Sequence, residues 1–309
     1  MSRYTVGVDF GGTNIKVGLV TDTGRVVAAQ VLPARPFGSP SSFVERIGAA
    51  VEGLARSVRL RPSALRGVGV GAPGSVDVER GVVHGLVNVP GWREVPLRRA
   101  LERQVRCRCA IDNDANLAAL GEWRFGAGRG ARQLIGITLG TGVGGGLVCH
   151  GAVYRGAVGA AGELGHMVID PQGARCGCGT RGCLEAHVGT AAIVRMGRRA
   201  LGTATSRGLT PARLSEAARR GDRAARAVWQ EVGRLLGLGV ANLVNLLNPD
   251  CVVIGGGVAN AWPWFAPALR RTVRAQALPI AARAARIVRA GLGERAGIVG
   301  AAVLIWEAI

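Results

Sequence analysis

The chain has 309 residues, of which 48% are hydrophobic and 19% charged, so it is long enough for two domains with cores of their own and is not disordered. The net charge of +19 would suggest nucleic acid as a partner. However, 38 of the 39 basic residues are arginines spread along the chain, and this preference for arginine over lysine is typical of the base composition of a genome, not of a nucleic-acid-binding segment. We expect neither nucleic acid nor a membrane as a partner, and the chain starts without a secretory leader, which predicts a cytoplasmic protein.

The first part of the chain alternates β-rich runs, glycine turns and amphipathic stretches. Residues 4–10 and 15–20 predict a hairpin around Gly11-Gly12-Thr13, and residues 25–32 predict a third strand. The next predicted elements are a helix from Ser41 or Ser42 to Val58, a buried strand at 67–71, loops at 72–74 and 88–92, a helix at 96–104, a strand at 107–111 and a helix at 115–123.

The pattern then starts again. Residues 133–139 predict a strand, 140–146 a glycine turn and 147–150 a second strand, and the stretch 135–142 aligns with 6–13. A strand–glycine turn–strand opening that occurs twice predicts two related α/β lobes with a cleft between them. The remaining predicted elements are a helix at 222–247, a strand at 251–254, a glycine turn at 255–257 followed by a helix, and a last helix at 297–309.

One stretch has the residues of a metal site. His166, Cys176, Cys178 and Cys183 lie within eighteen residues, and three thiolates with one imidazole make a complete tetrahedral set for zinc. Because all four positions are filled, no position remains for a reacting water, and the zinc is predicted to be structural. The alternative is that these cysteines are simply close together in a buried loop.

Three glycine turns could bind phosphate oxygens through backbone N–H groups, and together they favour a nucleotide. They are Gly11-Gly12, residues 140–146 and residues 255–257, and none is a P-loop; residues 144–146 could also be small for packing alone. Asp9 ends the first strand and could be an outer ligand of Mg²⁺ or form an Asx-turn. Lys16 could reach a phosphate or be merely exposed.

Carboxylates and amides also gather at the predicted junction of strand and helix around residues 111–116. Asn113 or Asp114 could cap the helix. A carboxylate there could equally remove the proton of a substrate hydroxyl while an amide fixes the orientation of a sugar. The residues leave both interpretations open.

Taken together, these motifs resemble those of the ROK family (repressors and sugar kinases), within the hexokinase/actin-like ATPase superfamily. The resemblance spans nearly the whole chain and implies an α/β fold of two related ribonuclease-H-like lobes with an interlobe cleft and a structural zinc loop. We predict a small lobe at 1–117 plus 297–309 and a large lobe at 118–296. The motifs are residues 9–13 with Lys16, 113–116, 139–146, 163–166 and 176–185.

The resemblance also implies roles for single residues. Asp114 would be the general base; Asn113, Glu163, His166 and Glu185 would bind the sugar hydroxyls, with Asn88 and Gly74 on the same side, and His166 would offer one nitrogen to zinc and the other to sugar. The residues expected at the nucleotide and its Mg²⁺ are Asp9, Gly11, Gly12, Thr13, Thr141, Gly142, Gly256 and Gly257.

The function implied is ATP-dependent phosphorylation of a hexose at its 6-hydroxyl, with glucose favoured by residues 71–74 and 88–92. The alternatives are kinases for N-acetylglucosamine, N-acylmannosamine, mannose or fructose, and a polyphosphate-dependent glucokinase. A sugar-sensing regulator without catalysis is a further alternative, although DNA-binding members carry an additional N-terminal segment and here the first strand begins at Tyr4. We expect a homo-oligomer, a dimer or a tetramer.

Overall fold

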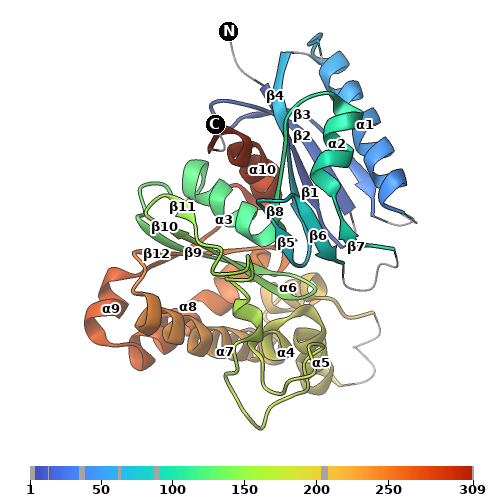
Figure 1. Ribbon diagram of the computed structural model, residues 1–309. Coiled ribbons are helices and arrows are strands. Elements are labelled where there is room, and N and C mark those ends of the chain that lie inside the picture. Colours follow the sequence, from blue (N-terminus) through green and yellow to red (C-terminus); the bar gives the residue numbers. More distant parts are fainter. Residues whose placement is uncertain are drawn as a thin grey trace.

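The computed structural model describes residues 4–12, 14–34, 39–61, 64–86, 91–202 and 208–307. Its centre is a pair of five-stranded sheets, one in each half of the chain (Figure 1). The first sheet has the order β3-β2-β1-β4-β8, with β1 antiparallel to β2 and parallel to β4. Its strands are β1 (Tyr4–Phe10), β2 (Asn14–Thr21), β3 (Val26–Pro33), β4 (Leu65–Ala72) and β8 (Cys109–Asn113).

The second sheet repeats this arrangement in the order β11-β10-β9-β12-β13, with β9 antiparallel to β10 and parallel to β12. The predicted repeat is therefore confirmed, because β1 and β9 occupy the same place in their sheets. The strands are β9 (Gln133–Leu139), β10 (Val143–Cys149), β11 (Ala152–Val153), β12 (Cys251–Gly255) and β13 (Arg286–Arg289).

Helices cover the outer faces of both sheets because their apolar sides need a partner surface. In the first lobe, α1 (Pro40–Ser57) packs on α2 (Leu97–Val105) and on β2, around buried Phe43 and Ile47. In the second lobe, α7 (Arg223–Leu247) and α8 (Trp262–Gln276) share a core with β9 and β12. The smaller elements of this lobe are α4 (Leu184–Val188), α5 (Thr190–Leu201), α6 (Pro211–Arg219), α9 (Pro279–Ala284), η2 (Leu164–His166), η3 (Gly257–Ala261) and η4 (Gly293–Arg295).

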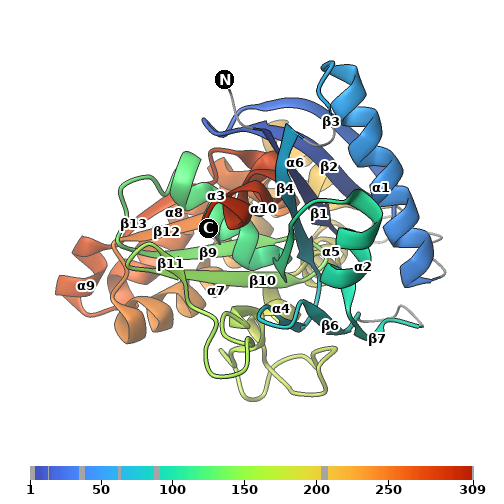
Figure 2. The ribbon, with the colours of Figure 1, turned by 45° about the horizontal axis from the view of Figure 1, so that its top comes forward.

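Two helices lie against each other between the sheets, α3 (Asp114–Phe125) and α10 (Ala296–Glu307) (Figures 1 and 2). The helix α3 follows the first sheet in sequence but packs on β9 and β10 of the second, whereas α10 follows the second sheet and packs on β1 and β4 of the first. The two helices approach so closely at Gly300 that a Cβ on this residue would collide with the carbonyl of Leu117. Ten residues of α10 are buried, on all sides of the helix, which is typical of a helix inside a core.

Two local predictions were wrong. The predicted glycine turn at 140–146 is shorter, because β10 already begins at Val143 and contains Gly144, Gly145 and Gly146. These glycines serve packing: a Cβ on Gly146 would lie 2.8 Å from both the carbonyl oxygen of Ala115 and the Cβ of Ala119 in α3. The helix α1 is capped by Ser39, not by Ser41 or Ser42, because the proline at position 40 suits the first helical turn.

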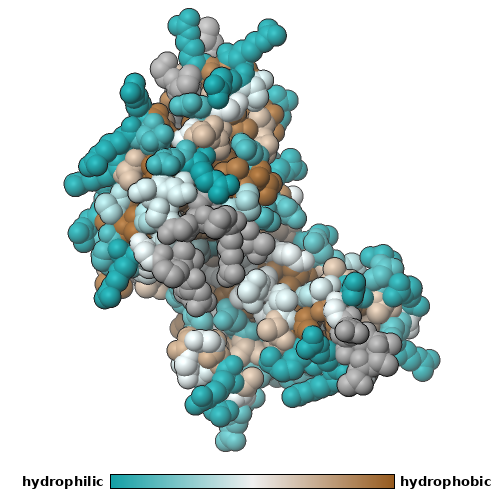
Figure 3. Space-filling model, turned by 90° about the vertical axis from the view of Figure 1, so that its right-hand side faces the viewer, coloured by the Kyte–Doolittle hydropathy of each residue, from teal (hydrophilic) through white to brown (hydrophobic). Residues whose placement is uncertain are grey.

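The sequence also missed a small sheet of short strands, β5 (Val76–Asp77), β6 (Val82–Gly85) and β7 (Arg93–Val95). The predicted lobe boundary at residues 117 and 118 falls within α3, and the division into lobes stays a proposal. No helix in the described part of the chain is long and apolar enough to cross a membrane. On the face shown in Figure 3, hydrophilic residues are spread over both lobes, and the hydrophobic patches among these residues are small.

Candidate active site

Two adjoining cavities lie where the carboxyl ends of β1, β8, β9 and β12 meet, a place where open α/β sheets commonly bind ligands. One has a volume of about 440 Å³ and the other about 450 Å³. Asp114, Thr138, Gly140 and Gly256 line both of them. Asp114 therefore lies where the two cavities adjoin, and it is the acidic side chain that lines both.

The turn from β8 into α3 presents Asp114. Asn113 caps the helix, since its Oδ1 accepts hydrogen bonds from the backbone N–H groups of Ala115 at 2.9 Å and Asn116 at 3.2 Å. Its Nδ2 donates to the carbonyl of Gly74 at 3.1 Å. The capping role that the sequence suggested for Asn113 is confirmed, and it leaves the neighbouring Asp114 directed toward the cavities.

Asp114 is half-buried, and burial together with the negative charge of Asp9 raises the pKa of its carboxyl to about 7. A hydrogen bond from the backbone N–H of Ala115 to Oδ1, at 2.9 Å, opposes this shift. A carboxyl with a pKa near neutrality is suited to general base catalysis, since it can both accept and release a proton at the pH of the reaction.

The first cavity is lined by glycines and alanines and by six charged residues, which are Asp9, Lys16, Asp114, Glu122, Arg289 and Glu294. Burial also raises the pKa of Asp9, at the end of β1, while the charge of Lys16 opposes that shift. Lys16 lies at this cavity, where its Nζ is 3.1 Å from Oε2 of Glu294. A Cβ on Gly297 would lie 2.5 Å from the carboxyl carbon of Asp9, so the first turn of α10 approaches Asp9 closely.

The predicted phosphate-binding glycines divide between the two cavities. Gly11, Gly256 and Gly257 line the first, whereas Gly12, Thr141 and Gly142 line the second, which Gly256 also reaches. Gly256 has a φ of 82°, and a Cβ there would collide with the backbone of Leu139. Thr13, predicted at the same place, lies outside the described residues.

The second cavity collects the predicted sugar ligands. Glu163, His166 and Glu185 line it together with Gly74 and Asn113. Oε2 of Glu185 accepts a hydrogen bond from the backbone N–H of Val143 at 2.9 Å, and Glu163 is exposed. Asn88, which was predicted on this side, lies outside the described residues.

The four predicted metal ligands lie together. Each of the four residues offers one ligand atom, a ring nitrogen of His166 or the Sγ of a cysteine, and these four atoms all lie within 4.8 Å of one another. The Sγ atoms of Cys178 and Cys183 are 3.7 Å apart, and Sγ of Cys176 is 3.7 Å from Nδ1 of His166. Zinc–sulfur bonds of tetrahedral geometry place ligand atoms about 3.8 Å apart, so the residues fit a zinc ion.

The chemistry of the thiols also fits a cation. Hydrogen bonds from Thr180 lower the pKa of Cys178 to about 6, whereas burial and the neighbouring thiols raise that of Cys183 to about 12. Three thiolates in one place repel each other, and a bound metal ion removes that repulsion. His166 turns Nδ1 toward the sulfurs, and its Nε2 is 3.9 Å from Oε2 of Glu163.

Some residues at the cavities were not predicted. Arg289 of β13 and Asn260 of η3 line the first cavity, and Nη2 of Arg289 donates to Oδ1 of Asn260 at 2.7 Å. The sequence held no signal for Arg289, because one arginine among 38 does not stand out. The loop 159–162 lines the second cavity and could have been suspected from its glycines beside Glu163.

Comparison with known proteins agrees with this geometry. Residues 5–308 match the ROK family. The glucokinase of Halalkalibacterium halodurans is 38% identical, over 98% of this chain and 95% of its own length. The crystal structure of a ROK family glucokinase from Streptomyces griseus in complex with glucose and AMPPNP has a TM-score of 0.85 and 36% identity, covering 98% of this chain and 99% of that one.

Regulators are similar as well. The xylose repressor of Caldicellulosiruptor bescii is 29% identical over 97% of this chain, which matches 77% of the repressor. Both kinases and repressors are therefore similar to this chain, so only the residues of the site can distinguish a kinase from a repressor.

Proposed function

Because the chain belongs to the ROK family, we propose that it is a hexokinase-type sugar kinase that transfers the γ-phosphoryl group of ATP to the 6-hydroxyl of glucose. The observation that carries this proposal is the position of Asp114, on the wall that the two cavities share, with a pKa raised to about 7. The similarity to glucokinases over 98% of the chain favours glucose among the hexoses.

In this proposal the second cavity holds the sugar. Asn113, Glu163, His166 and Glu185 bind its hydroxyls, and Gly74 lies beside them. The two carboxylates can accept from sugar hydroxyls, the imidazole of His166 can accept or donate, and Asn113 can donate the second N–H of its amide, since its Oδ1 is taken by the helix cap. Asp114 then accepts the proton of the 6-hydroxyl as the oxygen attacks phosphorus, which contributes on the order of 10²–10⁴-fold to the rate.

The first cavity holds the nucleotide. Where the two cavities adjoin, Gly12, Thr141 and Gly142 of the second cavity offer backbone N–H groups to the phosphates. Gly11 lies beside the phosphates in the first cavity, with its own N–H donated to the carbonyl of Asn14, and Gly256 with Gly257 lies near the adenosine. Mg²⁺, when bound, neutralises charge on the phosphates, and Asp9 is placed to orient its hydration shell. Positioning and charge neutralisation are the main needs of phosphoryl transfer, and this cleft offers both.

Zinc has a structural part in this proposal. Held by His166, Cys176, Cys178 and Cys183, it would fix the loop from which Glu163 and Glu185 reach the sugar. Nδ1 of His166 faces the sulfurs, so Nε2 stays available for a hydroxyl. We propose further that the protein is a homo-oligomer, a dimer or a tetramer, in the cytoplasm.

A sugar-sensing regulator without catalysis is the second candidate, favoured by the similarity to the xylose repressor over 97% of this chain. Such a protein would bind sugar in the second cavity and need no base. The presence of Asp114, with its raised pKa, favours the kinase.

Purified protein loaded with zinc should be assayed with glucose, mannose, fructose, N-acetylglucosamine and N-acetylmannosamine, each with ATP and with polyphosphate as donor. We expect the highest kcat/KM for glucose with ATP. Turnover with another sugar or donor would correct the substrate and leave the kinase. Sugar binding by calorimetry with no turnover of any pair would overturn the kinase in favour of the regulator.

A further inference from the structure

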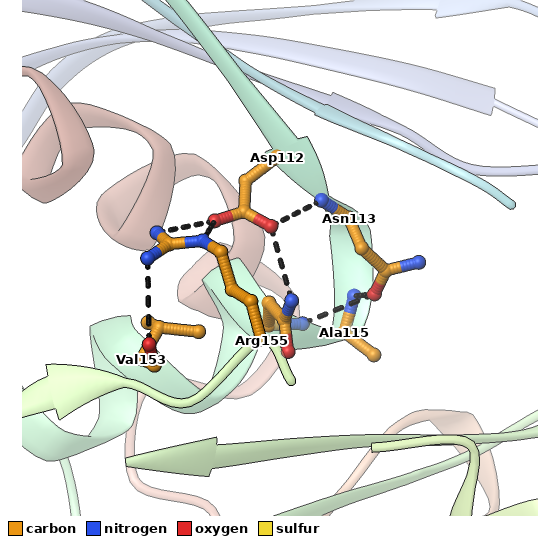
Figure 4. A network of polar contacts seen from close by, with 6 residues as sticks. Asp112, Asn113, Ala115, Val153 and Arg155 are labelled. Atoms are coloured by element: carbon orange, nitrogen blue, oxygen red, sulfur yellow. Dashed lines mark hydrogen bonds and ion pairs between the residues drawn. The ribbon is translucent and has the colours of Figure 1, made fainter. Parts of the chain in front are cut away.

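Asp112 is the carboxylate of the 111–116 motif that faces neither cavity. It is 1% exposed, and its oxygens accept three hydrogen bonds and make an ion pair with Arg155 (Figure 4). Oδ1 accepts from the backbone N–H of Asn113 at 2.7 Å and from Nδ2 of Asn116 at 3.0 Å. Oδ2 accepts from Nε of Arg155 at 2.8 Å and is 2.6 Å from its Nη2. Both oxygens of the Asp112 carboxylate are therefore bound by groups of the protein itself.

Through Oδ1, Asp112 determines the geometry of the turn that carries the base. Oδ1 binds the backbone N–H of Asn113, directly before Asp114, and the side chain of Asn116, two positions after Asp114. Within the described residues, Oδ1 of Asn116 is buried without a hydrogen-bond partner, so Asp112 is the contact that fixes this side chain. A shift of Asp112 would thus be passed on to Asp114.

Arg155 comes from the other half of the chain, directly after β11. Its Nη1 donates to the carbonyl of Val153 at 3.3 Å. Its own carbonyl accepts a hydrogen bond from the N–H of Ala161 at 3.0 Å, which closes the loop 156–160. The residues that follow, up to Glu163, line the second cavity.

One arginine therefore joins two parts of the site. Its backbone closes the loop that leads to Glu163, on the sugar side, and its guanidinium holds the carboxylate behind Asp114. A two-pronged contact between a guanidinium and a carboxylate fixes distance and angle together, which a single-pronged contact with lysine does not.

We propose that Arg155 and Asp112 are a pair of positioning residues that couple the sugar-side loop 155–163 to the turn that presents Asp114. Neither residue lines either cavity. This inference rests on the proposed kinase function, because it assigns Arg155 and Asp112 to the placement of its base. A bound sugar that orders the loop 155–163 would then also align Asp114, through the contact between Arg155 and Asp112.

The test compares Arg155→Met with Arg155→Lys. The control is Arg234→Met, because Arg234 also makes a two-pronged pair, with Glu231 on the surface of α7, at 2.7 Å through both Nε and Nη2. We expect Arg155→Met to lower kcat by about 10- to 100-fold, since small misplacements of reacting groups have effects of that order. KM for the sugar should rise less, Arg155→Lys should recover part of kcat, and the control should match the wild type.

The double variant Asp112→Asn/Arg155→Met separates positioning from stability. Arg155→Met alone leaves a buried charge unpaired and lowers the melting temperature, whereas the double variant removes that charge. We expect the double variant to regain melting temperature while kcat stays low. Recovery of kcat together with the melting temperature would mean that only the unpaired charge mattered and would overturn the inference.

Hydrogen exchange decides the coupling independently of turnover. Peptides that cover 111–117 and 154–163 should both exchange faster in Arg155→Met than in the wild type, and neither should change in Arg234→Met. Faster exchange in only one of the two segments overturns the coupling even if the wild type is an active kinase. A wild type without turnover in which both segments respond would overturn the proposed function and leave the coupling standing.

Discussion

Asp9 and Asp114 face the same cavity from the end of β1 and the start of α3, and the charge of Asp9 is, after burial, the largest cause of the raised pKa of Asp114. In the proposed function, these two carboxyls at one cavity have different tasks. Asp9 lies beside Lys16 and the first turn of α10, where it can serve a cation, whereas Asp114 is left as the group that holds a proton near neutral pH.

Asp114→Asn tests the base directly. The amide keeps the size of the side chain but cannot accept the hydroxyl proton, so kcat should fall by about 10²–10⁴-fold while glucose affinity stays within a few-fold. Steady-state kinetics and calorimetry measure the two quantities. The exposed Asp22, at the turn after β2, provides the control Asp22→Asn, which should behave as the wild type. Retained turnover in Asp114→Asn would show that another group is the base.

The pH dependence of activity follows from the same carboxyl. With a pKa of about 7, Asp114 is protonated below that pH, so kcat/KM for glucose should fall as the pH is lowered through 7. Asp9→Asn removes the neighbouring negative charge and should move this acidic limb to lower pH. A limb that stays in place in Asp9→Asn, or a profile that is flat from pH 6 to 8, contradicts the assigned cause.

The raised pKa also has a consequence for stability. The folded pKa of about 7 lies above the ordinary value of 3.8, so the contribution of Asp114 to stability is present below pH 4 and is lost as the pH rises through 7. Asp114→Asn does not titrate and escapes this loss. Its melting temperature should exceed that of the wild type by about 2–4 °C at pH 8 and match it near pH 4. An equal difference at both pH values would speak against a raised pKa.

Removal of zinc should weaken the binding of the sugar more than the binding of the nucleotide. Cys178→Ala should purify without zinc and bind glucose at least about 10-fold more weakly, since loss of ligands or their supports typically costs 10–100-fold. Elemental analysis and calorimetry measure both effects. Cys149→Ala, outside the cluster, should keep one zinc per chain and its affinity. Unchanged glucose affinity in a zinc-free variant would remove zinc from the sugar site.

The contact between α3 and α10 predicts opposite effects at two glycines. Gly300→Ala forces a methyl group into the backbone of Leu117 and should destabilise the protein by about 1–3 kcal/mol or more. Gly53→Ala places its methyl group in open space on α1 and should stabilise by about 0.4–1 kcal/mol. Urea unfolding gives both values. Similar effects of the two substitutions would contradict the close packing of the helices.

Much of the fold could be predicted, because it rests on local patterns. The hairpin of β1 and β2 and its counterpart in β9 and β10 follow from alternating apolar residues and glycine turns. The helix α7 ends at Leu247 with Asn248 as its C-cap, where the Asn-Pro pair predicts a stop. The short strands β5, β6 and β7 could not be predicted, because two to four residues carry no periodicity. The extent of β10 could not be predicted, because Gly144 and Gly146 are small where they contact α3 and Gly145 is small where it contacts Gly162 and Leu164, and none of these contacts is local in sequence.

The candidate site was predictable to the extent that its residues form motifs. The four cluster residues do lie together, as their spacing predicted, and Asp114 lies between the cavities. Arg155 and Arg289 escaped prediction, because their importance depends on partners far away in sequence: Asp112 in one case and Asn260 in the other. The roles of Asn88 and Thr13 remain predictions.

The exchange of helices between the sheets has a consequence for how the protein is made. The sheet that contains β1 and β4 is synthesised first, yet one of its faces is covered by α10, at residues 296–307. Until those residues leave the ribosome, this face, where Gly7 and Gly69 lie against the backbone of Ile298 and Ala301, lacks the cover of α10, and the first half cannot complete its packing. We therefore expect residues 1–125, expressed alone, to aggregate, and addition of a peptide corresponding to 296–307 to rescue part of the soluble fraction.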